Sequence, residues 1–115
     1  MSHLVKNFKF AWHGLVYIFK REKNFKIELI LFVLAVLVAW WLEFSIMAWA
    51  LLILLAVLVI ILEINNTIIE RILDMVEPRL SGQVGLIKDI QAAIVLMMAA
   101  AAFLVGLLLI IEHLP

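Results

Sequence analysis

"FSIMAWALLILLAVLVIIL", residues 44–62, is a run of apolar side chains that only Ser45 interrupts. A helix needs about 20 apolar residues to cross the hydrocarbon of a bilayer, so this run predicts a transmembrane helix. A second run of the same kind covers residues 92–111, where Gly106 is the only interruption. Together the two runs predict a membrane protein built from helices.

A third and shorter apolar run covers residues 29–42. It is long enough to span a membrane if the helix begins near residue 26 and if Trp40 and Trp41 lie in the aromatic belt at its far end. We therefore expect three membrane-spanning helices, which cover about residues 26–42, 44–62 and 90–111.

The composition leads to the same conclusion. Hydrophobic residues make up 68% of the 115 residues, and the mean hydropathy is +1.22. Soluble globular domains are only about 45–50% apolar, so a soluble protein is excluded. The chain has no cysteine, which excludes disulfides and thiolate metal sites.

The lysines and arginines predict how the spans are oriented. Six of the nine precede the first span, three lie between the second and the third, and none lies near Glu43 or after Ile111. Cytoplasmic loops of membrane proteins carry an excess of these residues. We therefore expect the N-terminus and the 63–90 loop in the cytoplasm and the C-terminus outside.

Residues 4–19 have the spacing of an amphipathic helix. One side carries Leu4, Phe8, Ala11, Trp12, Leu15, Ile18 and Phe19. The other side carries Lys6, Lys9, His13, Val16, Tyr17 and Lys20. A basic face opposite an aromatic and apolar face is typical of a helix that lies flat on an anionic membrane. An ordinary helix packed on the bundle is the alternative; we favour the surface helix, over about residues 3–20.

The stretch "EINNTIIERILD", residues 63–74, places polar side chains directly after the apolar run 44–62. At 3.6 residues per turn, five of them share a stripe about 100° wide, while Asn65 faces away. The five are Glu63, Asn66, Thr67, Glu70 and Asp74. Glu70 and Asp74 could be a solvated helix end. Glu63 follows the apolar run without a polar spacer, which favours a functional role because charge at a membrane position is costly.

Other charged residues are expected at the same depth. Glu22 and Glu28 flank the start of the first span, and Lys88 with Asp89 stands before the third. All three spans therefore bring charge to one cytoplasmic layer. Carboxylates with an amide and a lysine suit a hard divalent cation, and they equally suit a proton or cation pathway.

The connection 75–87 holds Pro78, Gly82 and Gly85, so we expect the helix that leaves the membrane to end near Val76.

Four motifs are similar, in order and spacing, to those of the small prokaryotic integral-membrane diacylglycerol kinase family, which also contains the undecaprenol kinases. They are "WHGL" (12–15), "EKNFKIE" (22–28), "EINNTIIERILD" (63–74) and "KDIQAAIVL" (88–96). The resemblance covers nearly the whole chain.

This resemblance implies an all-α membrane protein, with residues 1–115 as a single domain and three such subunits in a homotrimer. It implies transfer of the γ-phosphate of MgATP to the hydroxyl of diacylglycerol, which gives phosphatidic acid, in the bacterial inner membrane. Undecaprenol is the alternative substrate. The implied partners are ATP, Mg²⁺ and a membrane lipid, with no nucleic acid.

The resemblance also implies a role for each matching residue. Catalytic positions are Glu63, as the general base, and Asn66. Metal-binding positions are Glu22 and Glu70, and both also bind the nucleotide together with Lys88 and Asp89. Lipid-binding positions are Phe25, Lys26, Glu28, Glu63 and Ala92. Phosphoryl transfer requires mostly positioning and charge neutralisation, so such a set is chemically sufficient.

Two other functions compete with the kinase. A small proton-coupled transporter needs an acidic residue in the middle of a span, and the expected spans carry none there. A purely structural membrane subunit leaves the polar stripe without a role. Charge gathered on one side of the membrane favours chemistry at the interface.

Overall fold

The computed structural model describes residues 2–77, 79 and 81–115, and over these residues its regular structure is helical. The helices are α1 (Ser2–Arg21), α2 (Lys23–Trp41), α3 (Ile46–Val76) and α4 (Ser81–His113). Each of α2, α3 and α4 is long and apolar enough to cross a membrane. The all-helical fold and the three candidate spans expected from the sequence are therefore confirmed.

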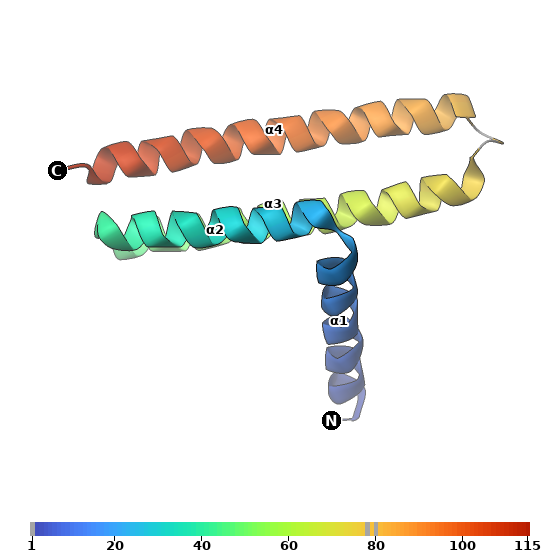
Figure 1. The fold of residues 1–115 in the computed structure, drawn as a ribbon, viewed down its shortest axis with the longest axis horizontal. Helices are drawn as coiled ribbons and strands as arrows, with labels where there is room; N and C mark the ends of the chain where they lie inside the picture. The colour runs from blue at the N-terminus through green and yellow to red at the C-terminus, as the bar shows by residue number, and fades with distance from the viewer. Residues whose placement is uncertain (1, 78, 80) are drawn as a thin grey trace.

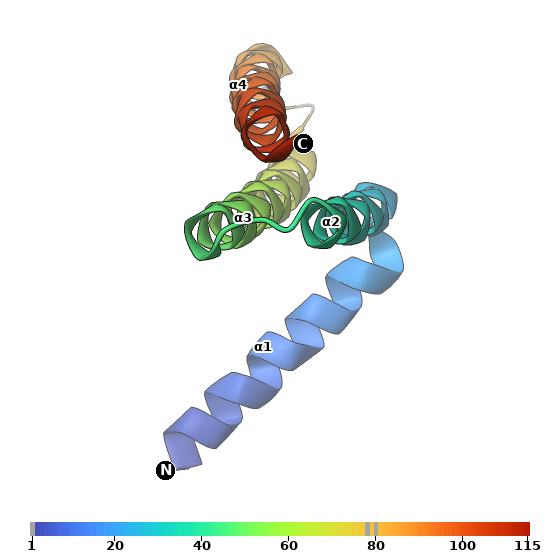
Figure 2. The same cartoon turned by 90° about the vertical axis from the view of Figure 1, so that its left-hand side faces the viewer.

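Helices α2, α3 and α4 lie side by side with their long axes in nearly the same direction, and α3 packs against both α2 and α4 (Figures 1 and 2). Helix α1 runs across this direction, and the C-terminal end of α1 contacts α2 (Figure 1). The end of α3 and the start of α4 lie at one end of the bundle, the α2–α3 turn and the C-terminus lie at the other, and the α1–α2 junction lies part-way between them (Figure 1).

Small side chains let the spans approach one another. Ala39 of α2 is fully buried and Ala48 of α3 is 2% exposed. Most of the larger apolar side chains are exposed instead. A bilayer removes the penalty for exposed apolar surface, and close packing of small residues is what joins helices there.

The α2–α3 turn is a Schellman motif. The Phe44 N–H donates to the Ala39 carbonyl over 3.0 Å, and the Glu43 N–H donates to the Trp40 carbonyl over 3.2 Å. Glu43 adopts a φ of 57°, the left-handed conformation that this motif requires at its turning residue. Ser45 is the N-cap of α3, and its hydroxyl oxygen accepts the Ala48 N–H over 3.2 Å.

His113 joins the end of α4 to this turn. Its Nδ1 lies 2.7 Å from the Leu109 carbonyl, and its Nε2 accepts the Ser45 N–H over 3.1 Å. Its ring stacks on Phe44 with 4.3 Å between centroids. Since Nε2 accepts, Nδ1 carries the proton that is donated to Leu109.

Helix α3 ends at Val76, as expected, and the Glu77 N–H caps it by donating to the Leu73 carbonyl over 3.0 Å. Pro78, which the sequence interpretation used as the helix breaker, lies outside the described residues.

The length expected for the connection is wrong, because residues 81–87 are already helical. Glycine in a helix costs only about 1 kcal/mol relative to alanine, and two glycines do not outweigh a 33-residue helix. Val84, between Gly82 and Gly85, is only 2% exposed, so packing supports this first part of α4.

Candidate active site

The polar stretch of α3 divides into a buried and an open part. Glu63 is 9% exposed and Thr67 is 6% exposed, whereas Asn66 is half-buried and Glu70 is exposed. The Thr67 hydroxyl donates to the backbone carbonyl of Glu63 over 3.2 Å, so this hydroxyl has its hydrogen-bond partner within α3. The Glu63 carboxyl is therefore the buried acid of this stretch.

The Glu63 carboxyl meets polar groups of α2. Asn24 and Glu28, which lie one turn apart on α2, are both close enough to interact with it through their side chains. The Oε2 atom of Glu28 is buried and has no hydrogen-bond partner within the described part of the chain. A buried polar atom without a partner is costly. This carboxyl pair therefore offers an acceptor position that a hydroxyl group can fill.

Glu28 also lies at the polar end of an apolar cavity between α2, α3 and α4. The cavity measures about 300 Å³. Its lining comprises Glu28, Leu31, Phe32, Ala35, Leu52, Leu55, Ala56, Val59, Ile60, Ala102, Phe103 and Gly106. A lipid with a polar end and a hydrocarbon chain matches this lining.

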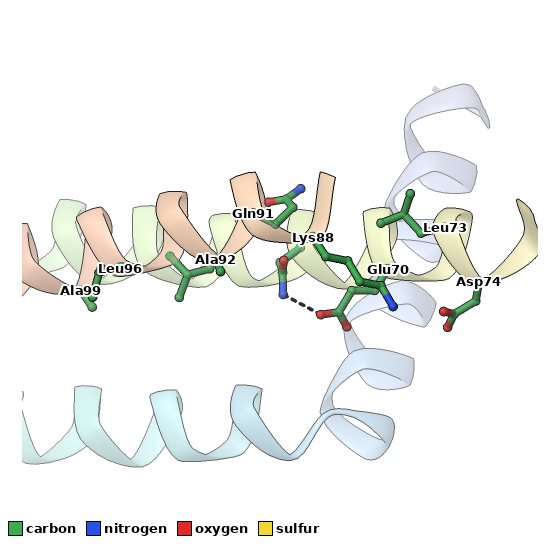
Figure 3. A pocket seen from close by; sticks show the side chains of 10 residues that line it. Glu70, Leu73, Asp74, Lys88, Gln91, Ala92, Leu96 and Ala99 are labelled. Carbon is green, nitrogen blue, oxygen red and sulfur yellow. Dashed lines mark hydrogen bonds between the residues drawn. The ribbon is translucent and has the colours of Figure 1, made fainter. Parts of the chain in front are cut away.

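A second and larger cavity, of about 740 Å³, lies between α3 and α4 (Figure 3). Its lining comprises Asn66, Glu70, Leu73, Asp74, Lys88, Gln91, Ala92, Val95, Leu96 and Ala99. Carboxylates, amides and a lysine gather at one end, and small or apolar side chains continue along α4.

Hydrogen bonds and ion pairs position the polar side chains of this cavity. The Asn66 Nδ2 donates to the Glu70 Oε1 over 3.3 Å (Figure 3). Lys88 Nζ lies 3.8 Å from Oε2 of Glu77, the residue that caps α3. Both partners of this ion pair are nearly half exposed, so it holds Lys88 only weakly.

The structure brings together four of the site residues expected from the sequence. They are Asn66, Glu70, Lys88 and Ala92, all of which line the α3–α4 cavity. Glu63 and Glu28 lie together instead on the α2 side of α3. Asp89 is exposed and is not part of the cavity lining.

The remaining expected residues lie at the junction of α1 and α2. Phe25 is 6% exposed and packs edge-on against Phe19 with 6.4 Å between ring centroids. The Lys26 Nζ lies 5.5 Å from the centre of the same Phe19 ring. Glu22 faces α3, where its Oε1 lies 4.0 Å from the Arg71 guanidinium.

Two carboxylates of the site, Glu70 and Glu22, have donor chemistry compatible with a magnesium nucleotide. No three His, Asp or Glu side chains of the described residues are close enough to form a cage. Mg²⁺ in nucleotide sites is held by only one or two carboxylates, and water and phosphate oxygens complete its shell. Glu70 and Glu22, both hard oxygen donors near the surface, suit that mode of binding.

Several polar residues of the site were missed by the sequence interpretation. Asn24 could have been found, because it lies four residues before Glu28 and so shares its face of α2. Glu77 gave no such signal, because its proximity to Lys88 depends on how α4 folds back on α3. Gln91, which also lines the cavity, is a different case, because it lies three residues after Lys88 and so shares its face of α4.

Comparison with known proteins supports the family that the sequence motifs indicate. Residues 9–110 match the sequence model of the family described as prokaryotic diacylglycerol kinase. A diacylglycerol kinase of Synechocystis is 35% identical over 105 residues, which are 90% of this chain and 60% of the relative. A diacylglycerol kinase of Escherichia coli strain K12 is 30% identical over 112 residues, which are 97% of this chain and 92% of the relative. The similarity reaches every expected site residue, and the resemblance is confirmed.

Proposed function

The chain belongs to the prokaryotic diacylglycerol kinase family, and we propose that it is an ATP-dependent lipid kinase that phosphorylates diacylglycerol. The observation that carries the proposal is the buried carboxyl of Glu63, one helical turn from Asn66 and the polar cavity between α3 and α4. A proton acceptor and a phosphate-binding surface thus occur on one helix.

In the proposed reaction the Glu63 carboxylate accepts the proton of the lipid hydroxyl. The hydroxyl oxygen bonds to the γ-phosphorus of ATP, and the bond from that phosphorus to the β,γ-bridging oxygen breaks. The products are phosphatidic acid and ADP. A positioned base contributes about 100- to 10,000-fold to such a proton transfer.

The residues around the α3–α4 cavity bind the nucleotide in this proposal. Asn66 holds the Glu70 carboxylate in place, and Lys88 leaves Glu77 to neutralise phosphate charge. Asp89, beside Lys88, assists in binding the nucleotide, as the family resemblance implies. Glu70 and Glu22 hold Mg²⁺, which when bound neutralises charge on the phosphate oxygens.

The lipid lies on the α2 side of α3 in this proposal. Glu28 faces Glu63 and also borders the apolar cavity between the spans, which suits the hydroxyl of the lipid next to its hydrocarbon chains. Phe25, Lys26 and Ala92 complete the lipid-binding set that the family resemblance implies.

We further propose that the enzyme is a homotrimer in the bacterial inner membrane, with the N-terminus and the α3–α4 connection in the cytoplasm. The nine lysines and arginines support this orientation, because they lie before the first span or between the second and third. Helix α1 lies flat on the cytoplasmic surface. Its direction across the spans and its exposed Phe8, Trp12 and Leu15 support that position.

The direct test of the proposal is to measure which of the two lipids, diacylglycerol or undecaprenol, the protein phosphorylates. Purified protein would be incubated with γ-labelled ATP and each lipid in turn, and the labelled products would be separated. We expect label in phosphatidic acid, because the named relatives are diacylglycerol kinases. Label only in undecaprenyl phosphate would identify the other branch of the family, and no label in either lipid would refute the kinase proposal.

A further inference from the structure

Tyr17 lies where α1, α2 and α3 meet, and two arginines stack on it. The guanidinium carbon of Arg21, one turn further along α1, lies 5.6 Å from the centre of the Tyr17 ring. The guanidinium carbon of Arg71, which comes from α3, lies 5.4 Å from the same centre. A single aromatic ring thus contacts one cation from each of two helices.

These two cations are only partly neutralised. Glu22 is 4.0 Å from Arg71, at the limit of an ion pair, and the Arg71 side chain remains 52% exposed. Within the described residues, Arg21 forms no ion pair with a carboxylate. The cluster therefore carries a surplus positive charge, which an anion bound between the two guanidinium groups would neutralise.

The chemistry of the cluster points to a phosphate. Guanidinium groups present several donors in a planar fork that matches phosphate oxygens, and stacking on an aromatic ring fixes their orientation. One phosphodiester carries one negative charge, which equals the surplus of two arginines over Glu22.

The position of the cluster indicates where that phosphate comes from. Helix α1 leaves the bundle at this junction and runs across the spans, as a helix does at the level of lipid headgroups (Figure 2). Tyr17 is itself partly exposed, and tyrosines concentrate at this level of a membrane. The cytoplasmic leaflet of membranes is rich in anionic lipids.

We propose that Tyr17, Arg21 and Arg71 form a binding site for the headgroup phosphate of an anionic phospholipid. Neither arginine lines the α3–α4 cavity or the cavity beside Glu28, so the site lies next to the proposed phosphotransfer site and meets it only at Glu22, which pairs with Arg71. The bound lipid is not the substrate; it fastens α1 to α3 at the membrane surface. The inference does not depend on the kinase reaction.

The test measures which lipids the protein retains. The full-length protein would be equilibrated in nanodiscs of equal parts phosphatidylglycerol and phosphatidylcholine, and the retained lipids would be counted by native mass spectrometry. The variants are Arg21→Gln, Arg71→Gln and Arg71→Lys. Lys9→Gln is the matched control, since it removes the same charge from α1 two turns before Tyr17.

We expect the protein and the Lys9→Gln control to prefer phosphatidylglycerol. Each arginine-to-glutamine change should reduce that preference about tenfold, because it removes a charge-assisted hydrogen bond to the phosphate that Lys9 does not make. Arg71→Lys should have an intermediate preference because it retains the charge and loses the fork. Arg21→Gln separates this effect from the loss of the Arg71–Glu22 ion pair, because within the described residues Arg21 forms no ion pair with Glu22.

Two results would overturn the proposal. One is an equal loss of preference in Lys9→Gln, which would mean that the whole basic face attracts lipid without a defined site. The other comes from adding inorganic phosphate in a parallel sample: if it displaces phosphatidylglycerol from the protein completely, the cluster binds a free anion.

Discussion

The Asn66 amide nitrogen donates a hydrogen bond to the Glu70 carboxylate over 3.3 Å, one turn further along α3. Both side chains line the α3–α4 cavity. Within the described residues, the second oxygen of Glu70 has no hydrogen-bond partner and is available to another ligand. The contact with Asn66 thus aligns a carboxylate that is otherwise exposed to solvent.

The first prediction concerns this contact. Asn66→Ala should reduce lipid phosphorylation about 10- to 100-fold, because it removes a hydrogen bond to a charged group. Asn65→Ala is the control, since Asn65 is exposed and lies outside the cavity. Initial rates at several ATP concentrations would measure both. Equal rates in the two variants would show that Glu70 needs no positioning.

The ion pair between Lys88 and Glu77 leads to the second prediction. Glu77→Gln should lower the KM for ATP by up to about fivefold, because an exposed ion pair that competes with the nucleotide is worth at most about 1 kcal/mol. Glu112→Gln removes the same charge from the other end of the bundle and should leave KM unchanged. An increased KM in Glu77→Gln would mean that Glu77 itself assists the nucleotide.

The third prediction concerns the left-handed residue of the α2–α3 turn. Glu43→Gly should raise the free energy of unfolding by up to about 1 kcal/mol, because the relief of the left-handed cost, about 1–2 kcal/mol, exceeds the extra entropy that glycine has in the unfolded chain. Glu43→Ala keeps that cost and should give no such gain. The free energy of unfolding of both variants would be measured in the same detergent. Equal values would mean that the positive φ at this position causes no strain.

His113 provides the fourth prediction. His113→Phe keeps a ring for stacking on Phe44 but loses the contacts with Ser45 and Leu109. We expect a loss of about 1–2 kcal/mol in the free energy of unfolding. His13→Phe, at an exposed position of α1, is the control. If both substitutions have the same effect, His113 does not tie α4 to the turn.

The sequence predicts the helices of this protein better than it predicts their contacts. Apolar runs long enough for a bilayer determine α3 and α4, and Val76 ends α3 as expected. Helical spacing placed Asn66 and Glu70 on one face, and both line one cavity. The roles of these residues in catalysis stay predictions.

The contacts that the sequence did not predict depend on how separate helices pack. Lys88 reaches Glu77 because α4 begins at Ser81 and folds back on α3. Arg71 reaches Tyr17 because α1 leaves the bundle beside α3. Periodicity within one helix contains no information about such pairs. Residues 81–87 are helical although Gly82 and Gly85 favour a connection, because the packing of Val84 outweighs this local glycine signal.

The central claim is that Glu63 is the base of a lipid kinase, and Glu63→Gln tests it most directly. The amide is nearly the same size but cannot accept the hydroxyl proton. The measurement is phosphatidic acid formed from labelled ATP and diacylglycerol, with helix content and oligomeric state checked on the same sample. We predict an intact assembly whose rate is lower by about 100- to 10,000-fold. A folded Glu63→Gln protein that phosphorylates diacylglycerol at the full rate would contradict the claim.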